Sequence, residues 1–322
     1  MTQSLHPDLL AQAILNTHQA RFGGPGVLPP VSESPDLPGL QQAAWRACRA
    51  LGFIDIDATC LAQAWQARAE RTQRTQHTQH TAVTDDLSWP DQPQDFGLGR
   101  YSDGLPAFAP CPRALGLYVV APDAQWIARL ATMGIPTLQL RFKSADPIAV
   151  RSEIKAALAA VQGTDVRLFI NDHWQIALEE GAWGIHLGQE DLAELSETDL
   201  SAMRKAGVRL GVSTHGYAEM VLADQVRPSY IAMGAVYPTT LKAMATAPQG
   251  VARLMAYADL LNRQAPPYPL VAIGGIDRQR LSEVLPSGVG SVAVVRAVLA
   301  AADPQAEAQA LMQAIKACAA KS

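Results

Sequence analysis

Cysteine and long apolar runs are both scarce in this chain. The four cysteines, Cys48, Cys60, Cys111 and Cys318, stand far apart and form no CxxC pair, so neither a disulfide framework nor a thiolate metal site is indicated. No run approaches the roughly 18 apolar residues of a membrane span. The first ten residues also lack a basic start followed by an apolar core. We therefore expect a soluble protein of the reducing cytoplasm.

An excess of basic residues is also missing. The chain has 26 lysines and arginines against 30 aspartates and glutamates, a net charge of −4, which argues against binding to nucleic acid or to a membrane surface. Its 48% hydrophobic and 17% charged residues are typical of a globular protein. The 322 residues suffice for one large domain or two. Small molecules are the expected partners, and the oligomeric state, a homo-oligomer included, stays open.

The sequence changes character near residues 70 and 113. Helical stretches are expected over about 7–20, 38–51 and 57–70, while residues 71–112 combine the repeat RTQRTQHTQHT with many turn-forming residues. His77 and His80 in this polar tract are expected to be solvated rather than to bind metal. We predict a helical extension over 1–70, an irregular linker over 71–112 and a main domain over 113–322. A shortened chain that begins near Arg113 should then fold and stay active.

From Leu115 onward, short aliphatic runs alternate with amphipathic segments of helix length. The runs are LGLYVVA, TLQLRF, VRLFIN, GIHLG, RLGVST, YIAMGAV, LVAIGG and SVAVV. Continuous Val/Ile/Leu runs are typical of parallel strands covered on both faces, and eight βα units are the number that closes a (β/α)8 TIM barrel. An open doubly wound sheet is the alternative, but no strand is followed by a GxGxxG fingerprint. We therefore predict an α/β fold, a TIM barrel with a mainly helical and irregular extension before it.

Polar residues gather just after the predicted strands. They include Arg141, Lys143, Asn171, Asp172, Gln189, Glu190, Asp191, Ser213, Thr214, His215, Thr239, Thr240, Lys242, Gly274, Gly275 and Arg296. In a barrel, these carboxyl ends of the strands meet on one rim, where catalytic sites lie. Surface polarity placed at random would decorate the opposite ends as well. The one-sided placement therefore indicates a catalytic mouth.

Two aspartates of this rim predict a metal site. Asp172, in IND, and Asp191, in HLGQED, follow neighbouring strands one βα unit apart. Hard oxygen ligands near cations favour Mg²⁺ holding phosphate groups over zinc. Arg141, Lys143 and Lys242 face these acids across the mouth in the predicted barrel, an arrangement suited to a diphosphate. Each aspartate could instead be a loop residue or a helix cap.

A second phosphate seat is indicated by GGI after the seventh predicted strand and VVRA after the eighth. Glycines at this place let backbone N–H groups approach a phosphate. His186 lies inside the run GIHLG and is expected to be a packed, hydrogen-bonded residue more than a catalytic one, while His215 could be a base or the start of a helix. No Ser/His/Asp or Cys/His pattern is legible, so covalent catalysis is not favoured.

Seven short motifs follow one another in a recognisable order. They are QLRFK at 139–143, FIND at 169–172, HLGQEDL at 186–192, GVSTH at 211–215, GAVYPTTLK at 234–242, AIGGI at 272–276 and VAVVRAV at 292–298. Together they resemble the thiamine phosphate synthase family over residues 115–318. The resemblance implies a TIM-barrel transferase that joins 4-amino-5-hydroxymethyl-2-methylpyrimidine diphosphate to a thiazole phosphate and releases diphosphate. It also implies Mg²⁺ and a dissociative displacement through a pyrimidine carbocation.

The resemblance assigns roles by position. Asp172 and Asp191 would bind magnesium. The pyrimidine diphosphate would contact Gln139, Leu140, Arg141, Phe142, Lys143, Asn171, Ser213 and Lys242, with catalytic roles for Arg141, Lys143, Ser213 and Lys242. The thiazole phosphate would contact Thr239, Thr240, Leu241, Gly275, Val295 and Arg296.

Two residues of the thiazole phosphate site depart from the family's usual pattern. Leu241 stands where threonine is usual, and Arg296 stands where serine is usual. Arg296 could supply a charge-assisted contact in place of a hydroxyl, or the acceptor specificity could be shifted.

Two rival functions stay open. A related thiazole tautomerase would use the same phosphate seat without magnesium, and a sensor of thiamine phosphate would bind without turnover. Asp172, Asp191, Arg141 and Lys143 argue against the tautomerase. The segment ALGFIDIDATCLAQAW faintly resembles the tail of pyrimidine phosphate kinases, but it lacks a phosphate loop, so no kinase activity is expected.

Overall fold

The computed structural model describes residues 6–75, 86–101, 104–239 and 246–319. Contacts between residues divide the chain into two compact units. The first, here called the helical unit, holds Met1–Ser102, Gly216–Gln225 and Asp259–Ala265. The second, the barrel unit, holds Asp103–His215, Val226–Ala258 and Pro266–Ser322. Within the described residues, no helix has both the length and the apolar character needed to cross a membrane.

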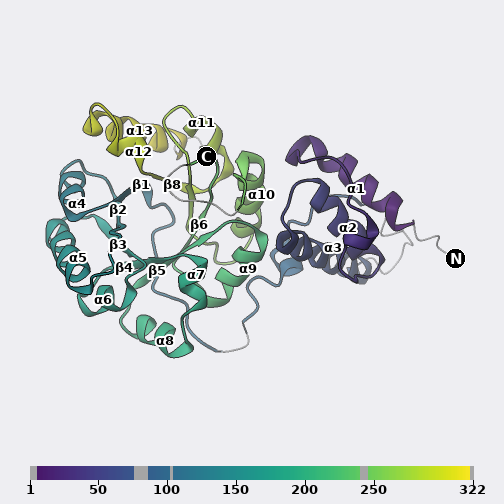
Figure 1. Ribbon diagram of the computed structural model, residues 1–322, viewed down its shortest axis with the longest axis horizontal. Coiled ribbons are helices and arrows are strands. Elements are labelled where there is room, and N and C mark those ends of the chain that lie inside the picture. The colour runs from purple at the N-terminus through teal and green to yellow at the C-terminus, as the bar shows by residue number, and fades with distance from the viewer. Residues whose placement is uncertain (1–5, 76–85, 102–103, 240–245, 320–322) are drawn as a thin grey trace. The chain divides into compact units, whose positions relative to one another are not determined.

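Eight parallel strands close into a barrel. Their bounds are Gly116–Ala121 (β1), Thr137–Leu140 (β2), Arg167–Asn171 (β3), Gly184–Leu187 (β4), Arg209–Thr214 (β5), Tyr230–Met233 (β6), Leu270–Ile273 (β7) and Gly290–Val294 (β8). Each strand pairs with the next along the chain, and β1 pairs with β8, Leu117 lying opposite Val292. This closure confirms the predicted TIM barrel and rules out the open sheet (Figure 1).

The barrel interior is filled by large rings that need glycine on the neighbouring strand. Tyr118, Phe169 and Tyr230 are at most 2% exposed and belong to one core cluster. A Cβ atom on Gly184 would lie 2.5 Å from the Phe169 ring, and one on Gly211 would lie 2.1 Å from the Tyr230 ring. Glycine within a strand therefore marks the place where a neighbouring ring fills the space of a side chain.

Helices follow the strands of the barrel in sequence. Their bounds are Ala124–Ala131 (α4), Pro147–Val161 (α5), Trp174–Glu179 (α6), Gln189–Ala193 (α7), Glu197–Lys205 (α8), Tyr217–Val226 (α9), Gly250–Asn262 (α10), Leu281–Val284 (α11), Arg296–Leu299 (α12) and Pro304–Ala319 (α13). Several begin at a side-chain cap: Asp123 accepts from Trp126 N at 2.7 Å, and Asp146 accepts from Ile148 N at 2.9 Å. Such caps satisfy N–H groups that have no partner within the helix.

The helical unit contains three long helices close to the predicted ranges. They span Pro7–Phe22 (α1), Gly39–Ala50 (α2) and Asp55–Thr75 (α3). His18 and Trp89 pack edge to face at 5.0 Å between ring centroids, and Phe22 and Phe53 lie 5.5 Å apart. The unit therefore has an aromatic core of its own.

Part of the predicted linker is packed. Arg71 still belongs to α3 and forms a two-bond ion pair with Asp95, both distances being 2.8 Å. Trp89 is buried, and its Nε1 donates to the Tyr217 hydroxyl at 2.9 Å. Residues 86–101 are thus packed within the helical unit, although most of them lie outside helices and strands. The division at Arg113 stays a prediction, and His77 and His80 lie outside the described residues.

A chain that begins at Arg113 is expected to be less stable than the full chain. It would lose Asp57, which accepts from Ala218 N at 2.9 Å, and Gly99, whose N–H donates at 2.9 Å to the fully buried Asp224. Each buried group that loses its partner costs about 1–3 kcal/mol, and each kcal/mol lowers the Tm by roughly 2–4 °C. Thermal unfolding followed by circular dichroism measures this loss. Equal Tm values for the two chains would contradict the expectation.

Candidate active site

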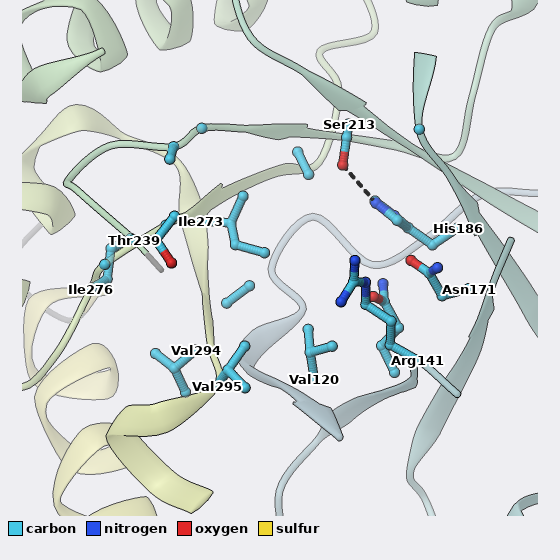
Figure 2. A pocket seen from close by; sticks show the side chains of 18 of the residues that line it. Val120, Arg141, Asn171, His186, Ser213, Thr239, Ile273, Ile276, Val294 and Val295 are labelled. Atoms are coloured by element: carbon cyan, nitrogen blue, oxygen red, sulfur yellow. Dashed lines mark hydrogen bonds between the residues drawn. The ribbon is translucent and has the colours of Figure 1, made fainter. Parts of the chain in front are cut away.

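A cavity of about 630 Å³ opens at the carboxyl ends of the barrel strands. Residues from the ends or following loops of strands β2–β8 line it, together with Val120 of β1. The side chains of Arg141 and Asn171 point into it from one side, and Val294 and Val295 border it on another (Figure 2). The predicted rim thus encloses one site.

Most of the predicted site residues line this cavity. They are Gln139, Arg141, Lys143, Asn171, Asp172, Asp191, Ser213, Thr239, Gly275, Val295 and Arg296. Leu140 and Phe142 are not among the described lining residues. Leu140 is buried in β2 opposite Ile170, and the carbonyl oxygen of Phe142 lies 3.0 Å from His173 Nε2. Thr240, Leu241 and Lys242 lie outside the described residues, so their roles stay predictions.

The two predicted metal ligands share one corner of the cavity. Asp172 follows β3 with a φ of 62°, a left-handed conformation that aspartate adopts more readily than most residues. Burial, followed by the negative charge of Asp172, raises the pKa of Asp191. Lys143 Nζ lies 2.6 Å from Asp172 Oδ2. Two acids and a cation therefore meet here, although the described residues contain no group of three or more potential metal-binding side chains.

Asp191 also accepts a hydrogen bond from the backbone. It is the third residue of α7, and its Oδ2 accepts from Gly188 N at 3.0 Å. The helix-cap alternative is therefore realised in this structure alongside the contact with the cavity. Because one carboxylate has several lone pairs, capping leaves acceptor capacity on Asp191 for a cation.

Glycines shape the second predicted seat. Gly274 and Gly275 have φ values of 104° and 65°. A Cβ atom on Gly274 would lie 2.4 Å from Ala235 Cβ, and one on Gly275 would lie 2.7 Å from the carbonyl oxygen of Pro238. Any other residue would therefore push the loop after β6 away from the loop after β7. Thr239 lies in that first loop and lines the cavity (Figure 2).

Arg280 is a cavity-lining cation that sequence reasoning missed. Its guanidinium donates to the Gly275 carbonyl oxygen and lies 4.4 Å from the centre of the Tyr237 ring. Tyr237 in turn donates its hydroxyl proton to Glu283 at 2.7 Å. No local pattern marks Arg280, because it stands five residues after the glycine pair and its approach depends on the fold.

His186 is packed and also reaches the cavity. It lies in β4 and is 7% exposed. Its Nδ1 lies 2.6 Å from the Tyr230 hydroxyl, and its Nε2 lies 2.8 Å from Ser213 Oγ (Figure 2). The expectation of a hydrogen-bonded histidine agrees with these contacts. His215, half-buried, also lines the cavity.

Comparison with known proteins places this cavity in a family. Residues 117–298 match the family described as thiamine monophosphate synthase. The chain belongs to this family. The match covers more than half of the chain and includes every residue from β2 to β8, and with them both predicted metal ligands. The resemblance read from the seven motifs is confirmed.

Relatives in this family match the chain over nearly their whole length. A thiamine-phosphate synthase from Cronobacter sakazakii is 49% identical over 208 residues, which are 65% of this chain and 96% of the relative. One from Serratia proteamaculans is 49% identical over 209 residues, 65% of this chain and 95% of the relative. The thiamine phosphate pyrophosphorylase structure from Pyrococcus furiosus has a TM-score of 0.54 and 26% identity, covering 63% of this chain and 96% of that one.

The chain is thus a transferase of the thiamine monophosphate synthase family, and its family portion is the barrel. Residues 1–116 lie outside the family match. All described lining residues fall between Val120 and Ala300. Apart from Ala300, every described lining residue therefore falls within the family match at 117–298.

Proposed function

We propose that the chain joins 4-amino-5-hydroxymethyl-2-methylpyrimidine diphosphate to a thiazole phosphate, forming thiamine phosphate and diphosphate. The observation that carries the proposal is the corner where Asp172, Asp191 and Lys143 meet beside Arg141 in one cavity. This combination of acids and cations suits a magnesium diphosphate.

The residues at this corner fit magnesium. Protein sites commonly hold Mg²⁺ through one or two carboxylates and complete its shell with water and substrate phosphates. The raised pKa of Asp191, caused by burial and by the charge of Asp172, supports two carboxylates that share one seat. Asp172 and Asp191 would hold the ion, which when bound neutralises charge on the departing diphosphate.

The cations complete this neutralisation. Arg141 and Lys143 would bind the diphosphate, a role that the family resemblance also assigns to Lys242. The bond between the exocyclic pyrimidine carbon and the diphosphate oxygen breaks, and the electron pair leaves with diphosphate. The resulting carbocation is stabilised by the electron-rich aminopyrimidine. The lone pair of the thiazole nitrogen then forms the new C–N bond, so no nucleophile of the protein is required.

Residues on the other side of the cavity would hold the acceptor. Gly275 and Val295 can offer backbone N–H groups to the thiazole phosphate, and Thr239 can offer a hydroxyl. Arg296 and Arg280 both line this region. Arginine forms strong paired hydrogen bonds with phosphate, so the two guanidinium groups favour an anionic acceptor.

Turnover with defined substrates tests the proposal. Mixing both substrates with magnesium should release diphosphate and form thiamine phosphate in equal amounts. Isomerisation of a thiazole alone would instead favour the tautomerase, and binding without turnover would favour the sensor. A shortened chain from Arg113 should keep turnover, because the described lining residues all lie within it.

Arg296→Ala is expected to raise the KM for the thiazole phosphate by about 10- to 150-fold. A hydrogen bond to a charged group contributes about 1.5–3 kcal/mol, and each 1.36 kcal/mol corresponds to about tenfold. Arg296→Ser, which carries the usual family residue, should recover part of this loss. The exposed Arg129 of α4 provides the control, since it does not belong to the described lining. Unchanged KM in both Arg296 variants would mean that this arginine points away from the phosphate.

A further inference from the structure

A continuous chain of hydrogen bonds runs through the barrel interior from Gln139 to Ser213. Gln139 Nε2 donates to the Tyr118 hydroxyl at 2.9 Å, and the hydroxyls of Tyr118 and Tyr230 lie 2.9 Å apart. Tyr230 and His186 make the next link at 2.6 Å, and His186 and Ser213 make the last at 2.8 Å (Figure 2). Both ends line the cavity, whereas the two tyrosines are buried.

The number of available protons limits the directions in which these four hydrogen bonds can run. Each tyrosine hydroxyl and a neutral imidazole holds one proton to donate. These three groups supply three protons, whereas the chain has four links. If all three of these protons are used within the chain, as is usual for buried donors, the fourth comes from an end, so one of Gln139 and Ser213 donates inward and the other accepts. Burial raises the pKa of Tyr118 and of Tyr230, so both phenols keep their protons near neutral pH.

The two ends are therefore coupled in what they offer the cavity. When Gln139 Nε2 donates inward, as it does here, each group passes its hydrogen bond toward Ser213. Ser213 Oγ then accepts from His186 Nε2 and keeps its own proton for an acceptor in the cavity. The Gln139 carbonyl oxygen remains an acceptor. If every hydrogen bond in this chain ran in the opposite direction, Gln139 would present a donor to the cavity and Ser213 would present an acceptor.

Packing holds the hydroxyls of this chain in place. Tyr118 and Tyr230 both pack on Phe169, with ring centroids 5.8 and 5.0 Å apart, and the His186 ring stacks on Tyr230 at 5.6 Å. Strand β5 touches the far side of Tyr230, since a Cβ atom on Gly211 would lie 2.1 Å from its Cζ. In an interior packed this closely, the two tyrosine hydroxyls have no room to turn to other partners.

We infer that this chain of hydrogen bonds makes the cavity select a 4-aminopyrimidine over its 4-oxo counterpart, with Tyr118 and Tyr230 as positioning residues. An aminopyrimidine edge carries a donor amino group beside an acceptor ring nitrogen, whereas the 4-oxo form carries an acceptor beside a ring N–H. An acceptor on Gln139 and a donor on Ser213 complement the first edge and oppose the second. The inference rests on the proposed function, which supplies the aminopyrimidine.

The test compares two pyrimidine diphosphates on the full chain with magnesium and saturating thiazole phosphate. Selectivity is the ratio of kcat/KM for the 4-amino substrate to that for its 4-oxo analogue. Tyr230→Phe keeps the ring but removes the central hydroxyl, which uncouples the two ends. We expect the ratio to fall by about tenfold or more, the effect of about one hydrogen bond. Tyr118→Phe breaks a neighbouring link and should also lower it, which keeps the test decisive if Tyr230→Phe fails to fold.

Tyr257→Phe is the matched control. Tyr257 is also buried, and its hydroxyl donates at 3.0 Å to Gln249, but this tyrosine lies on α10 and not among the described lining residues. A lower ratio in the Tyr230 or Tyr118 variant, with the control unchanged, supports the inference.

Three results would overturn the inference: an unchanged ratio in a folded Tyr230→Phe or Tyr118→Phe variant, an equal loss in the Tyr257 control, or a ratio near one in the unmodified chain. Failure of the proposed function looks different, because the unmodified chain would then turn over neither pyrimidine.

Discussion

Gly275→Ala is expected to leave the barrel folded and to reduce kcat/KM for the thiazole phosphate on the order of 10²-fold. Gly275 has a φ of 65°, and a Cβ atom there would lie 2.7 Å from the Pro238 carbonyl oxygen and 2.8 Å from Tyr237 Cβ. The backbone of the loop after β6 would have to shift, and Thr239 lies in that loop. A displacement of about 1 Å at a substrate-positioning group can cost about 10²-fold in rate.

Gly134→Ala is the control that separates the strain of a left-handed backbone from the displacement of the loop after β6. Gly134 has a φ of 73°, close to that of Gly275, but a Cβ atom there would meet nothing within 4 Å. Both variants should lose about 1–2 kcal/mol of stability from the left-handed conformation. Only Gly275→Ala should lose turnover, chiefly through the thiazole phosphate and little through the pyrimidine diphosphate. Steady-state kinetics and Tm values for both variants provide the measurement, and an equal loss of turnover would contradict the proposed seat.

The barrel could be predicted because its signals are local. Runs such as LGLYVVA and YIAMGAV are wholly apolar, which is expected only when both faces of a strand are covered. Rim residues follow the same logic, since a polar residue directly after such a run must lie at the carboxyl end of a strand. Asp172 and Asp191 could therefore be assigned to one rim before their contacts were known.

The contacts inside the barrel could not be predicted in the same way. Tyr118 and Tyr230 are 112 residues apart in sequence, and their hydroxyls meet only because β1 and β6 point side chains into one interior. Arg280 reaches Gly275 through a turn whose course depends on Tyr237 in another loop. Pairings of this kind follow from register and packing, which a single sequence does not encode locally.

The packing of residues 86–101 was not predicted, and the reason lies in their composition. Residues 86–101 are rich in turn-forming residues, which is also typical of disorder. They include few aliphatic residues, yet Trp89, Phe96 and Leu98 are all at most 7% exposed. Two aromatic side chains can bury as much apolar area as several aliphatic ones, so a segment with few apolar residues can still pack.

Asp172→Asn and Asp191→Asn are expected to reduce kcat on the order of 10²-fold or more while the barrel stays folded. Each substitution keeps the shape of the side chain and removes one anionic oxygen ligand of the proposed magnesium. The loss should fall on kcat more than on KM, because charge on the diphosphate grows as the bond to carbon breaks. Interactions that are stronger in the transition state than in the ground state act on kcat.

Neither of the two variants should lose much stability. Asp172→Asn breaks the 2.6 Å ion pair with Lys143, a partly exposed pair worth about 0–1 kcal/mol. Asp191→Asn replaces the acceptor for Gly188 N, a cap that an asparagine side-chain oxygen can also provide. Neither change should lower the Tm by more than a few degrees, so any collapse of catalysis can be assigned to the site.

Asp165→Asn is the matched control for these variants. Asp165 is exposed and precedes β3, whereas Asp172 follows the same strand, so the two acids flank opposite ends of that strand. The control should keep the kcat of the unmodified chain at every magnesium concentration. Turnover is measured as diphosphate release while magnesium is varied and then removed with a chelator. If either Asp172→Asn or Asp191→Asn keeps near-normal kcat at limiting magnesium, or if the chelated enzyme stays active, the two-carboxylate mechanism is wrong. The cations alone would then have to stabilise the leaving diphosphate.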